Sequence, residues 1–165
     1  MTQIRAGTES DLPELTALYN HYAVGTHITF DTEPQDVVER REWLAHYATT
    51  GRHRLLVAQA SGRIVGYATS SRFRAKPGYD TSVETTVYVH PDLTGGGIGR
   101  ALYDALFSAL ADEDVHRAYA GIALPNDASV ALHVSHGFRH IGTFTEVGHK
   151  LGRWWDVAWY ERPLP

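Results

Sequence analysis

A glycine-rich turn separates a strand-like segment from a helix-like segment near the middle of the chain. Its glycines are Gly95, Gly96, Gly97 and Gly99. The strand before it contains Val87, Tyr88 and Val89, and apolar residues recur at helical spacing after it, from Ile98 to Leu110. A turn almost without side chains lets the unpaired N–H groups of a helix N-terminus approach an anion closely. The sequence therefore predicts a binding site for a phosphorylated ligand.

The turn does not match two other phosphate-binding motifs. Arg100 and Ala101 follow Gly99, so the Lys-Ser/Thr end of a P-loop is missing. A dinucleotide fingerprint fails because Arg100 stands where a small residue is needed, and no acidic residue follows at the usual distance. A plain glycine-rich connector is the alternative interpretation.

Glu84 and His133 are the two side chains best suited to move protons. Glu84 begins the buried strand, where partial burial would raise the pKa of its carboxyl group toward neutrality. His133 lies in a predicted helix and belongs to the residue type that titrates near neutral pH. The alternatives are a surface carboxylate paired with a loop cation, and a packed histidine bonded to a backbone carbonyl.

A loop at residues 72–79 concentrates cations and aromatic rings beside the strand that begins with Glu84. It contains Arg72, Phe73, Arg74, Lys76 and Tyr79. Arginine and lysine fit carboxylates and phosphoryl-like groups, so the loop is a candidate clamp for an anionic substrate. A merely solvated charge run is the alternative.

Two N-terminal helices follow a short strand at residues 3–6. The first is opened by residues 8–11 and turns Leu12, Leu15, Leu18, Tyr19 and Tyr22 inward. The second starts near Pro34 and turns Val37, Val38, Leu44 and Tyr47 inward, while its charged residues 39–42 are predicted to be solvated. Ile28 and Phe30, in the loop between the helices, either line a pocket or face the core.

The rest of the chain predicts a mixed sheet. Strands are expected at residues 55–60, 64–71, 83–89 and 118–124, and the helix after the glycine turn connects the last two through a right-handed parallel crossover. A short helix runs from Asn126 to a stop at Gly137, and an aromatic strand surrounds residues 154–160. The predicted fold class is α/β, with antiparallel pairing at its start.

Composition narrows the function classes. The length of 165 residues predicts one domain, residues 1–165, and the net charge of -4 makes nucleic acid an unsuitable partner. The chain has no cysteine, which excludes a disulfide framework and a thiol nucleophile. No apolar run approaches a membrane span, and no signal-peptide core begins the chain, so we expect no membrane partner and a cytoplasmic location.

Three segments resemble the GNAT N-acetyltransferase superfamily. Residues 94–99 are similar to its pyrophosphate-binding signature, although Thr94 stands where that signature has Gln or Arg. Residues 126–138 are similar to its cofactor-side helix, with Asn126 at the start, Gly-Phe at the end, and His133 where a Tyr is common. With residues 84–89 and 148–157, the chain resembles the phosphinothricin and methionine sulfoximine N-acetyltransferase branch.

This resemblance implies a fold, a reaction and a set of site residues. The fold would be a central, mostly antiparallel sheet with a parallel β-α-β crossover and helices on both faces. The residues expected to bind acetyl-CoA are Val87, Tyr88, Val89, Gly95, Gly96, Gly97, Ile98, Gly99, Arg100 and Asn126. Those expected to bind a small anionic amino-acid substrate are Phe30, Arg74, Lys76, Tyr79 and Tyr88. Members of this branch are dimers, so a homodimer is expected.

The implied reaction transfers an acetyl group from a thioester to an amine by direct attack. The amine must be neutral, so Glu84 is expected to remove its proton directly or through water, and His133 to act as acid or base. Backbone amides of the strand at Val87–Val89 would hold the acetyl carbonyl and stabilise the oxyanion.

Three other functions were weighed. A metal site built from His133, His136, His140 and His149 is disfavoured, because Gly137 breaks the helix and no well-placed carboxylate completes the set, so no metal is expected. A non-catalytic acetyl-CoA sensor would not need both Glu84 and His133. A protein N-terminal acetyltransferase would need a peptide groove, whereas the cationic loop favours a small anion.

Overall fold

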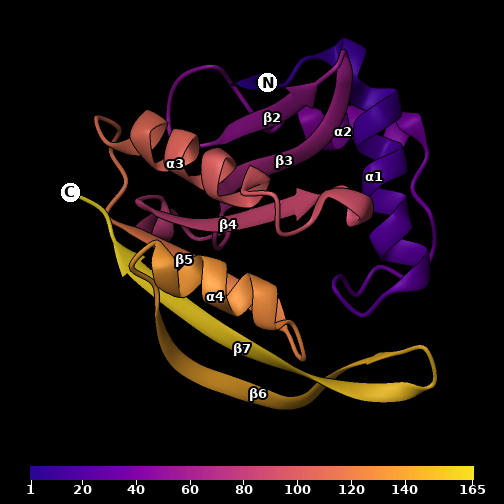
Figure 1. Cartoon of the computed structure of the whole chain (residues 1–165). Helices are drawn as coiled ribbons and strands as arrows, with labels where there is room; N and C mark the ends of the chain where they lie inside the picture. The colour runs from indigo at the N-terminus through magenta and orange to yellow at the C-terminus, as the bar shows by residue number, and fades with distance from the viewer.

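Seven strands form one mixed sheet in the order β1-β2-β3-β4-β5-β7-β6 (Figure 1). The computed structural model describes all of residues 1–165. The strands are β1 (Thr2–Ala6), β2 (Arg54–Ala60), β3 (Arg63–Arg72), β4 (Ser82–Val89), β5 (Arg117–Ala123), β6 (Arg139–Lys150) and β7 (Arg153–Pro163). Only β4 and β5 pair in parallel, and every other neighbouring pair is antiparallel. The predicted mixed sheet with one parallel crossover is confirmed.

Four α-helices cover the two faces of this sheet. They are α1 (Leu12–Gly25), α2 (Val37–Leu44), α3 (Ile98–Leu110) and α4 (Asp127–Ser135). The helices α3 and α4 lie on one face, and α1 and α2 lie on the other (Figure 1). None of the four has both the length and the apolar character that a bilayer crossing requires.

Each face of the sheet has its own apolar core. On the α3 side, Leu102, Leu106 and Leu110 of α3 pack against buried residues of the strands. On the α1 side, Leu15 and Leu18 pack against residues of β2 and β3. Because each helix buries one stripe and the central strands bury both faces, the sheet is held firmly in the middle of the molecule.

The parallel pair β4–β5 is short, and this opens the sheet. The two strands pair only where residues 82–84 of β4 meet residues 117–119 of β5. Beyond that point β4 continues its pairing with β3, and β5 continues its pairing with β7. The main chain of β4 from Thr85 onward therefore has no partner strand on its β5 side, and a wedge opens between the two strands.

The second helix differs from its prediction in both position and orientation. It begins at Val37 rather than near Pro34, because Asp36 caps it: the Asp36 carboxylate accepts from Glu39 N, and the Glu39 carboxylate accepts from Asp36 N. Val37 and Val38, expected inside, are 39% and 61% exposed. Arg40, expected on the solvated face, is 2% exposed. The inward face of this short helix is therefore built around an arginine.

The C-terminal segment is a long hairpin rather than a single final strand. Residues of β6 pair antiparallel with β7, and the pairing is irregular between Phe144 and Gly148. The strand β6 was missed in the sequence because it is exposed along almost its whole length. Without a buried face it lacks the apolar alternation from which a strand is predicted.

Candidate active site

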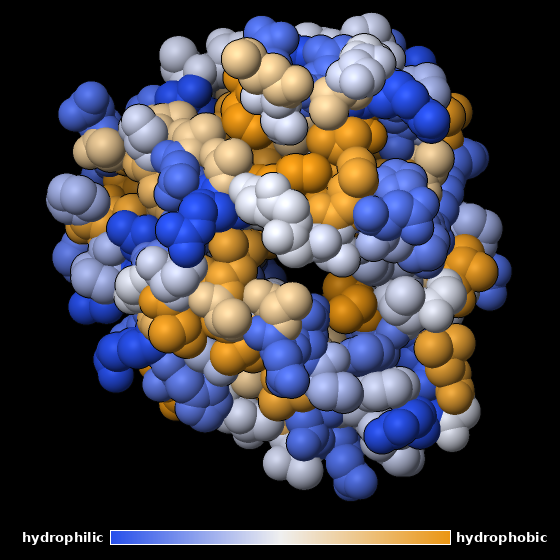
Figure 2. Space-filling view, in the orientation of Figure 1, coloured by the Kyte–Doolittle hydropathy of each residue, from blue (hydrophilic) through white to orange (hydrophobic).

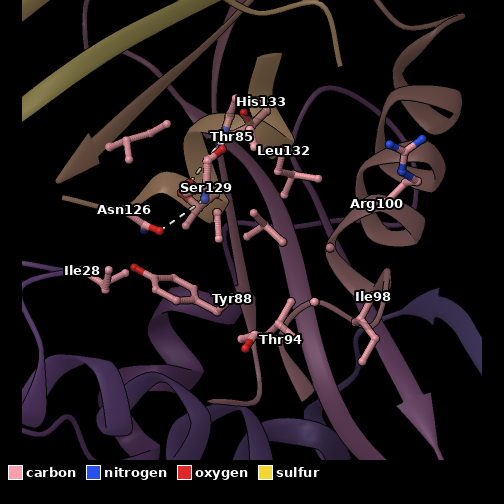
Figure 3. Close-up of a pocket in the computed structure, with 18 of the residues that line it drawn as sticks. Ile28, Thr85, Tyr88, Thr94, Ile98, Arg100, Asn126, Ser129, Leu132 and His133 are labelled. Carbon is pink, nitrogen blue, oxygen red and sulfur yellow. Dashed lines mark hydrogen bonds between the residues drawn. The ribbon is translucent and has the colours of Figure 1, made fainter. Parts of the chain in front are cut away.

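A cavity of about 690 Å³ occupies the wedge between β4 and β5. Its walls are the second half of β4, the end of β5, the glycine-rich turn and the inner side of α4. Figure 2 shows a hollow at the centre of the face that α3 and α4 cover. In Figure 3, Ile28 and Tyr88 approach Asn126 on one side of this cavity, and Thr94 and Ile98 border it on another.

The glycine-rich turn presents main-chain N–H groups to the cavity. Gly95 and Gly97 both have φ of 81°, a conformation that side-chain-bearing residues rarely adopt, and Gly97 is the N-cap of α3. No side chain caps this helix, and its first main-chain hydrogen bond runs from Ala101 N to Gly97 O at 3.0 Å. The N–H groups of residues 98–100 thus remain unpaired within the helix, as a bound anion requires.

This turn leaves room for an anionic group above its main-chain atoms. A Cβ atom added at Gly95 or Gly97 would meet nothing within 4 Å, so the space above these main-chain atoms is open. Gly99 allows close packing instead, since an added Cβ would lie 3.1 Å from Leu132 Cδ2 of α4. All predicted turn residues line the cavity except Gly96.

The strand β4 separates two differently built surfaces. Successive side chains of a strand point to opposite faces. Thr85 faces α3, where its Oγ1 lies 3.4 Å from the Tyr103 hydroxyl, whereas Tyr88 faces α1 and its ring lies against Tyr19 and Tyr22. Glu84 shares the Tyr88 side by this alternation. Val87, Tyr88 and Val89, which are expected to bind acetyl-CoA, all line the wedge.

Glu84 is a half-buried carboxylate that makes no hydrogen bond or ion pair with another residue. Burial raises the pKa of its carboxyl group above the usual range, and the positive charge of Arg74 partly opposes that rise. The surface ion pair considered as an alternative for Glu84 is not formed. Glu84 lines neither cavity and lies where the pairing of β4 with β5 ends. An unpaired carboxylate of raised pKa at that point is suited to accept a proton.

His133 is neutral, and both of its ring nitrogens are engaged. Its side chain borders the wedge but is 3% exposed, and burial lowers the pKa of the imidazole to about 4. Nδ1 donates to Ser129 O at 2.7 Å, so Nε2 accepts from the Tyr103 hydroxyl at 2.8 Å. In this arrangement the ring has no free proton to offer, which resembles the packed-histidine alternative more closely than an acid.

The residues expected to meet the substrate are not gathered at one point. Arg74, Lys76 and Tyr79 lie exposed in the loop between β3 and β4, and Arg74 alone influences the pKa of Glu84. Phe30 packs against the hairpin instead: a Cβ added at Gly148 would lie 2.3 Å from its ring. Phe30 lines neither of the two cavities described here.

Asn126 occupies the position predicted for it. It is the N-cap of α4, and its side-chain oxygen accepts from Ser129 N at 3.2 Å. Because one end of the amide is used by the helix, only the Nδ2 end is free to donate into the cavity that Asn126 lines. No group of three or more His, Cys, Asp or Glu residues is arranged to hold a metal ion.

A second cavity, of about 330 Å³, lies on the α1 side of β4 and was not foreseen from the sequence. We call it the Arg40 chamber; its lining comprises Tyr19, Asp31, Gln35, Glu39, Arg40, Trp43, Tyr47, Tyr67, Thr69, Ser71, Thr86 and Tyr88. One signal was present in the sequence. Arg40 stands at helical spacing from Leu44 and Tyr47, which were correctly expected to pack inward.

The splayed strand pair and the unpaired N-terminal amides of α3 form a cleft suited to an extended ligand that carries an anionic group. Residues 4–159 match the model of the acetyltransferase (GNAT) domain. The chain therefore belongs to the GNAT acetyltransferase family.

Characterised relatives and solved structures agree with this assignment. The chain is 63% identical to the phosphinothricin N-acetyltransferase of Streptomyces coelicolor, over 98% of this chain and 96% of that protein. It is 34% identical to the L-methionine sulfoximine/L-methionine sulfone acetyltransferase of Pseudomonas paraeruginosa, over 98% and 94%. The phosphinothricin acetyltransferase of Sinorhizobium meliloti, solved in complex with acetyl-CoA, superposes with a TM-score of 0.90 at 31% identity, over 99% and 88%.

Proposed function

We propose that the protein transfers the acetyl group of acetyl-CoA to the amino group of a small amino acid that carries a phosphinyl or sulfoximine group. The observation that carries this proposal is the unpaired, half-buried Glu84 at the point where β4 and β5 part. The names of the two relatives support the substrate class.

The glycine-rich turn and α4 would hold the coenzyme. The free N–H groups of residues 98–100 would bind the diphosphate, and Asn126 Nδ2 would donate to the pantetheine arm. The open edge of β4 at residues 87–89 would pair with that arm as a neighbouring strand does. A main-chain N–H of the same edge would stabilise the negative charge that develops on the acetyl oxygen.

Glu84 would prepare the amine for attack. An ammonium group has no lone pair, so it must lose a proton before it attacks the thioester carbonyl. A carboxylate whose pKa is raised by burial holds that proton better than an ordinary glutamate does, directly or through water. The neighbouring Arg74 would bind the substrate carboxylate, which lies close to the amine in any amino acid.

The departing sulfur needs a proton, and the attacking nitrogen must lose a second one. These two requirements balance through solvent: the C–S bond breaks, the nitrogen releases its proton, and the thiolate takes one up. The acid role predicted for His133 stays a prediction, since its ring would first have to leave Tyr103. We propose that His133 chiefly fixes α4 against α3.

A thiol-release assay with acetyl-CoA tests this function. We expect turnover with phosphinothricin and methionine sulfoximine, and little with short peptides. Turnover of peptides alone would favour a protein N-terminal acetyltransferase. Binding of acetyl-CoA without turnover of any amine would favour a sensor. Either result would overturn the proposed substrate class.

We also propose that the protein is a homodimer assembled through the β6–β7 hairpin. Large apolar side chains are exposed along it: Ile141, Phe144, Val147, Leu151 and Trp154. Such a patch on one surface is typical of an association site. Light scattering is expected to give twice the chain mass of 18.3 kDa, and Trp154→Ser to shift it toward the monomer. A wild-type monomer at micromolar concentration would contradict the proposal.

A further inference from the structure

Arg40 is a buried residue whose guanidinium keeps two nitrogens, Nε and Nη2, without a hydrogen-bonding partner. Its side-chain Nε and Nη2 are enclosed in the protein and meet no acceptor, and it forms no ion pair. A buried charge without a partner is costly, so charged groups are almost never fully buried unless they are paired. An acceptor that comes from outside the chain would explain why this residue is kept inside.

Aromatic rings fix the faces of this guanidinium and leave its edge free. The Arg40 Cζ lies 3.6 Å from the ring centroid of Trp43 and 4.6 Å from that of Tyr19. Rings hold a guanidinium by its flat faces, whereas its N–H groups point outward in the plane. Arg40 lines the Arg40 chamber, and its buried Nε and Nη2 are unpaired donors in the chamber wall.

The floor of the chamber leads to Glu84. Along β3 and β4, Tyr67 lies opposite Tyr88, Thr69 opposite Thr86, and Ser71 opposite Glu84. All but Glu84 line the chamber, and Glu84 continues the same row of side chains one step beyond Thr86, roughly 7 Å along the strand. An acceptor whose amine meets Glu84 can therefore extend its side chain into the chamber.

Two carboxylates also line the chamber, and both have other partners. The Asp31 carboxylate accepts from the Tyr19 hydroxyl and, at 3.2 Å, from Gln35 Nε2. Glu39 accepts from Asp36 N at 2.8 Å in the helix cap. Neither forms an ion pair with Arg40. The chamber thus offers free donors on Arg40 beside carboxylates that are already hydrogen-bonded.

We propose that Arg40 is a specificity-determining residue, whose Nε and Nη2 donate hydrogen bonds to the oxygen atoms of a tetrahedral phosphinyl, sulfonyl or sulfoximine group on the acceptor's side chain. This inference rests on the proposed function. Arg74 near Glu84 binds the α-carboxylate, so the two arginines bind the two ends of one small acceptor molecule. An acceptor with an aliphatic side chain leaves Arg40 unpaired, and a site of this kind rejects such analogues strongly.

The test compares acceptors that carry an oxygen-bearing tetrahedral group with one that has an aliphatic side chain. Arg40→Met removes the donors but keeps an apolar stem, and Arg40→Lys keeps the charge but loses the paired donors. The matched control is Arg41→Met, since Arg41 is the next residue of α2 and its half-exposed side chain pairs with Glu9 at the surface. KM and kcat are measured with phosphinothricin, methionine sulfone and leucine, and the KM for acetyl-CoA is measured in parallel.

We expect Arg40→Met to raise the KM for phosphinothricin and methionine sulfone by about 10- to 100-fold, as for the loss of hydrogen bonds to a charged group. The KM for leucine and the KM for acetyl-CoA are expected to stay within about twofold. Arg40→Lys is expected to change selectivity in the same direction, and it supplies the comparison should Arg40→Met not fold. A merely structural Arg40 would change all acceptors alike, and that result would overturn the inference.

A binding measurement separates this inference from the proposed function. Calorimetry in the presence of coenzyme A follows phosphinothricin binding to the wild type and to Arg40→Met. Binding that depends on Arg40, in an enzyme that turns over no amine, would overturn the proposed function and support the chamber. If Arg40→Met turns over phosphinothricin as the wild type does, the proposed function is supported and the role of the chamber is overturned. No binding by the wild type at millimolar concentration would overturn the chamber.

Discussion

The two cavities beside β4 are lined by different parts of the chain. On the α3 and α4 face, the wedge is bordered by the open edge of a strand and by the uncapped N-terminus of α3 after Gly97. On the α1 and α2 face, the Arg40 chamber is bordered by side chains from five separate segments. The first face presents main-chain amides, and the second presents a guanidinium, aromatic rings and hydroxyl groups.

This difference suits the α3 and α4 face to binding an invariant coenzyme and the α1 and α2 face to selecting the acceptor. Point substitutions other than those to proline leave the main-chain amides in place, so these amides suit a coenzyme whose structure never varies. Side chains can be exchanged one at a time, so they suit an acceptor that differs between related enzymes. In the proposed function, Glu84 lies between the two faces, where the acetyl group and the amine would meet.

Glu84→Gln is expected to have the largest effect on the reaction. Loss of a general base typically lowers kcat by about 100- to 10,000-fold, while the KM for acetyl-CoA should barely change because the wedge is intact. Steady-state thiol release measures both, and Glu42→Gln on the exposed side of α2 is the control. A variant that keeps the wild-type kcat would show that Glu84 is not the general base.

Gly97→Val tests the main-chain face alone. A β-branched residue at φ of 81° costs on the order of 1–3 kcal/mol and distorts the start of α3, so the KM for acetyl-CoA should rise by about 10- to 100-fold. Gly62→Val is the matched control, because Gly62 has φ of 79° in a remote turn. If both variants change the KM for acetyl-CoA equally, the effect is strain in the fold and not loss of a ligand site.

The main-chain face was predictable from the sequence, and the side-chain face largely was not. Four glycines within five residues are a local pattern, and Asn126 and Gly137 mark the two ends of α4 in the same local way. The chamber is formed by residues between Tyr19 and Tyr88, which only the fold brings together. The sequence predicts a solvent-exposed Arg40 because charged residues are usually exposed. Its helical spacing from Leu44 and Tyr47, however, matches the inward face of α2.

Arg74→Gln tests whether the charge of Arg74 lowers the pKa of Glu84. The positive charge of Arg74 lowers the raised pKa of Glu84, so its removal should raise that pKa further. The acidic limb of the kcat–pH profile should then move to higher pH, because more alkaline conditions are needed to ionise the base. Lys76→Gln is the control, since Lys76 is not among the groups that influence Glu84. Superimposable limbs would show that Arg74 acts only through binding.

His133 gives the smallest expected effect on turnover and a measurable effect on stability. Its pKa of about 4 lies below the 6.5 of an exposed histidine, so protonation favours the unfolded chain. The contribution is complete above pH 6.5 and is lost as the pH falls toward 4, on the order of 3 kcal/mol.

Urea unfolding at pH 7 and at pH 4.5 measures this contribution. The wild type should lose more stability between these values than His133→Gln does, because glutamine does not titrate. Turnover of His133→Gln should stay within about tenfold of the wild type if the ring mainly holds α4 against α3. A loss as large as that of Glu84→Gln would restore His133 as the acid of the reaction.

A crystal structure with coenzyme A and phosphinothricin bound together tests the division between the two faces most directly. We expect the diphosphate on the N–H groups of residues 98–100, the amine beside Glu84, and a phosphinyl oxygen within hydrogen-bonding distance of Arg40. A diphosphate bound away from the glycine-rich turn, or an acceptor lying on the α3 and α4 face, would contradict the account.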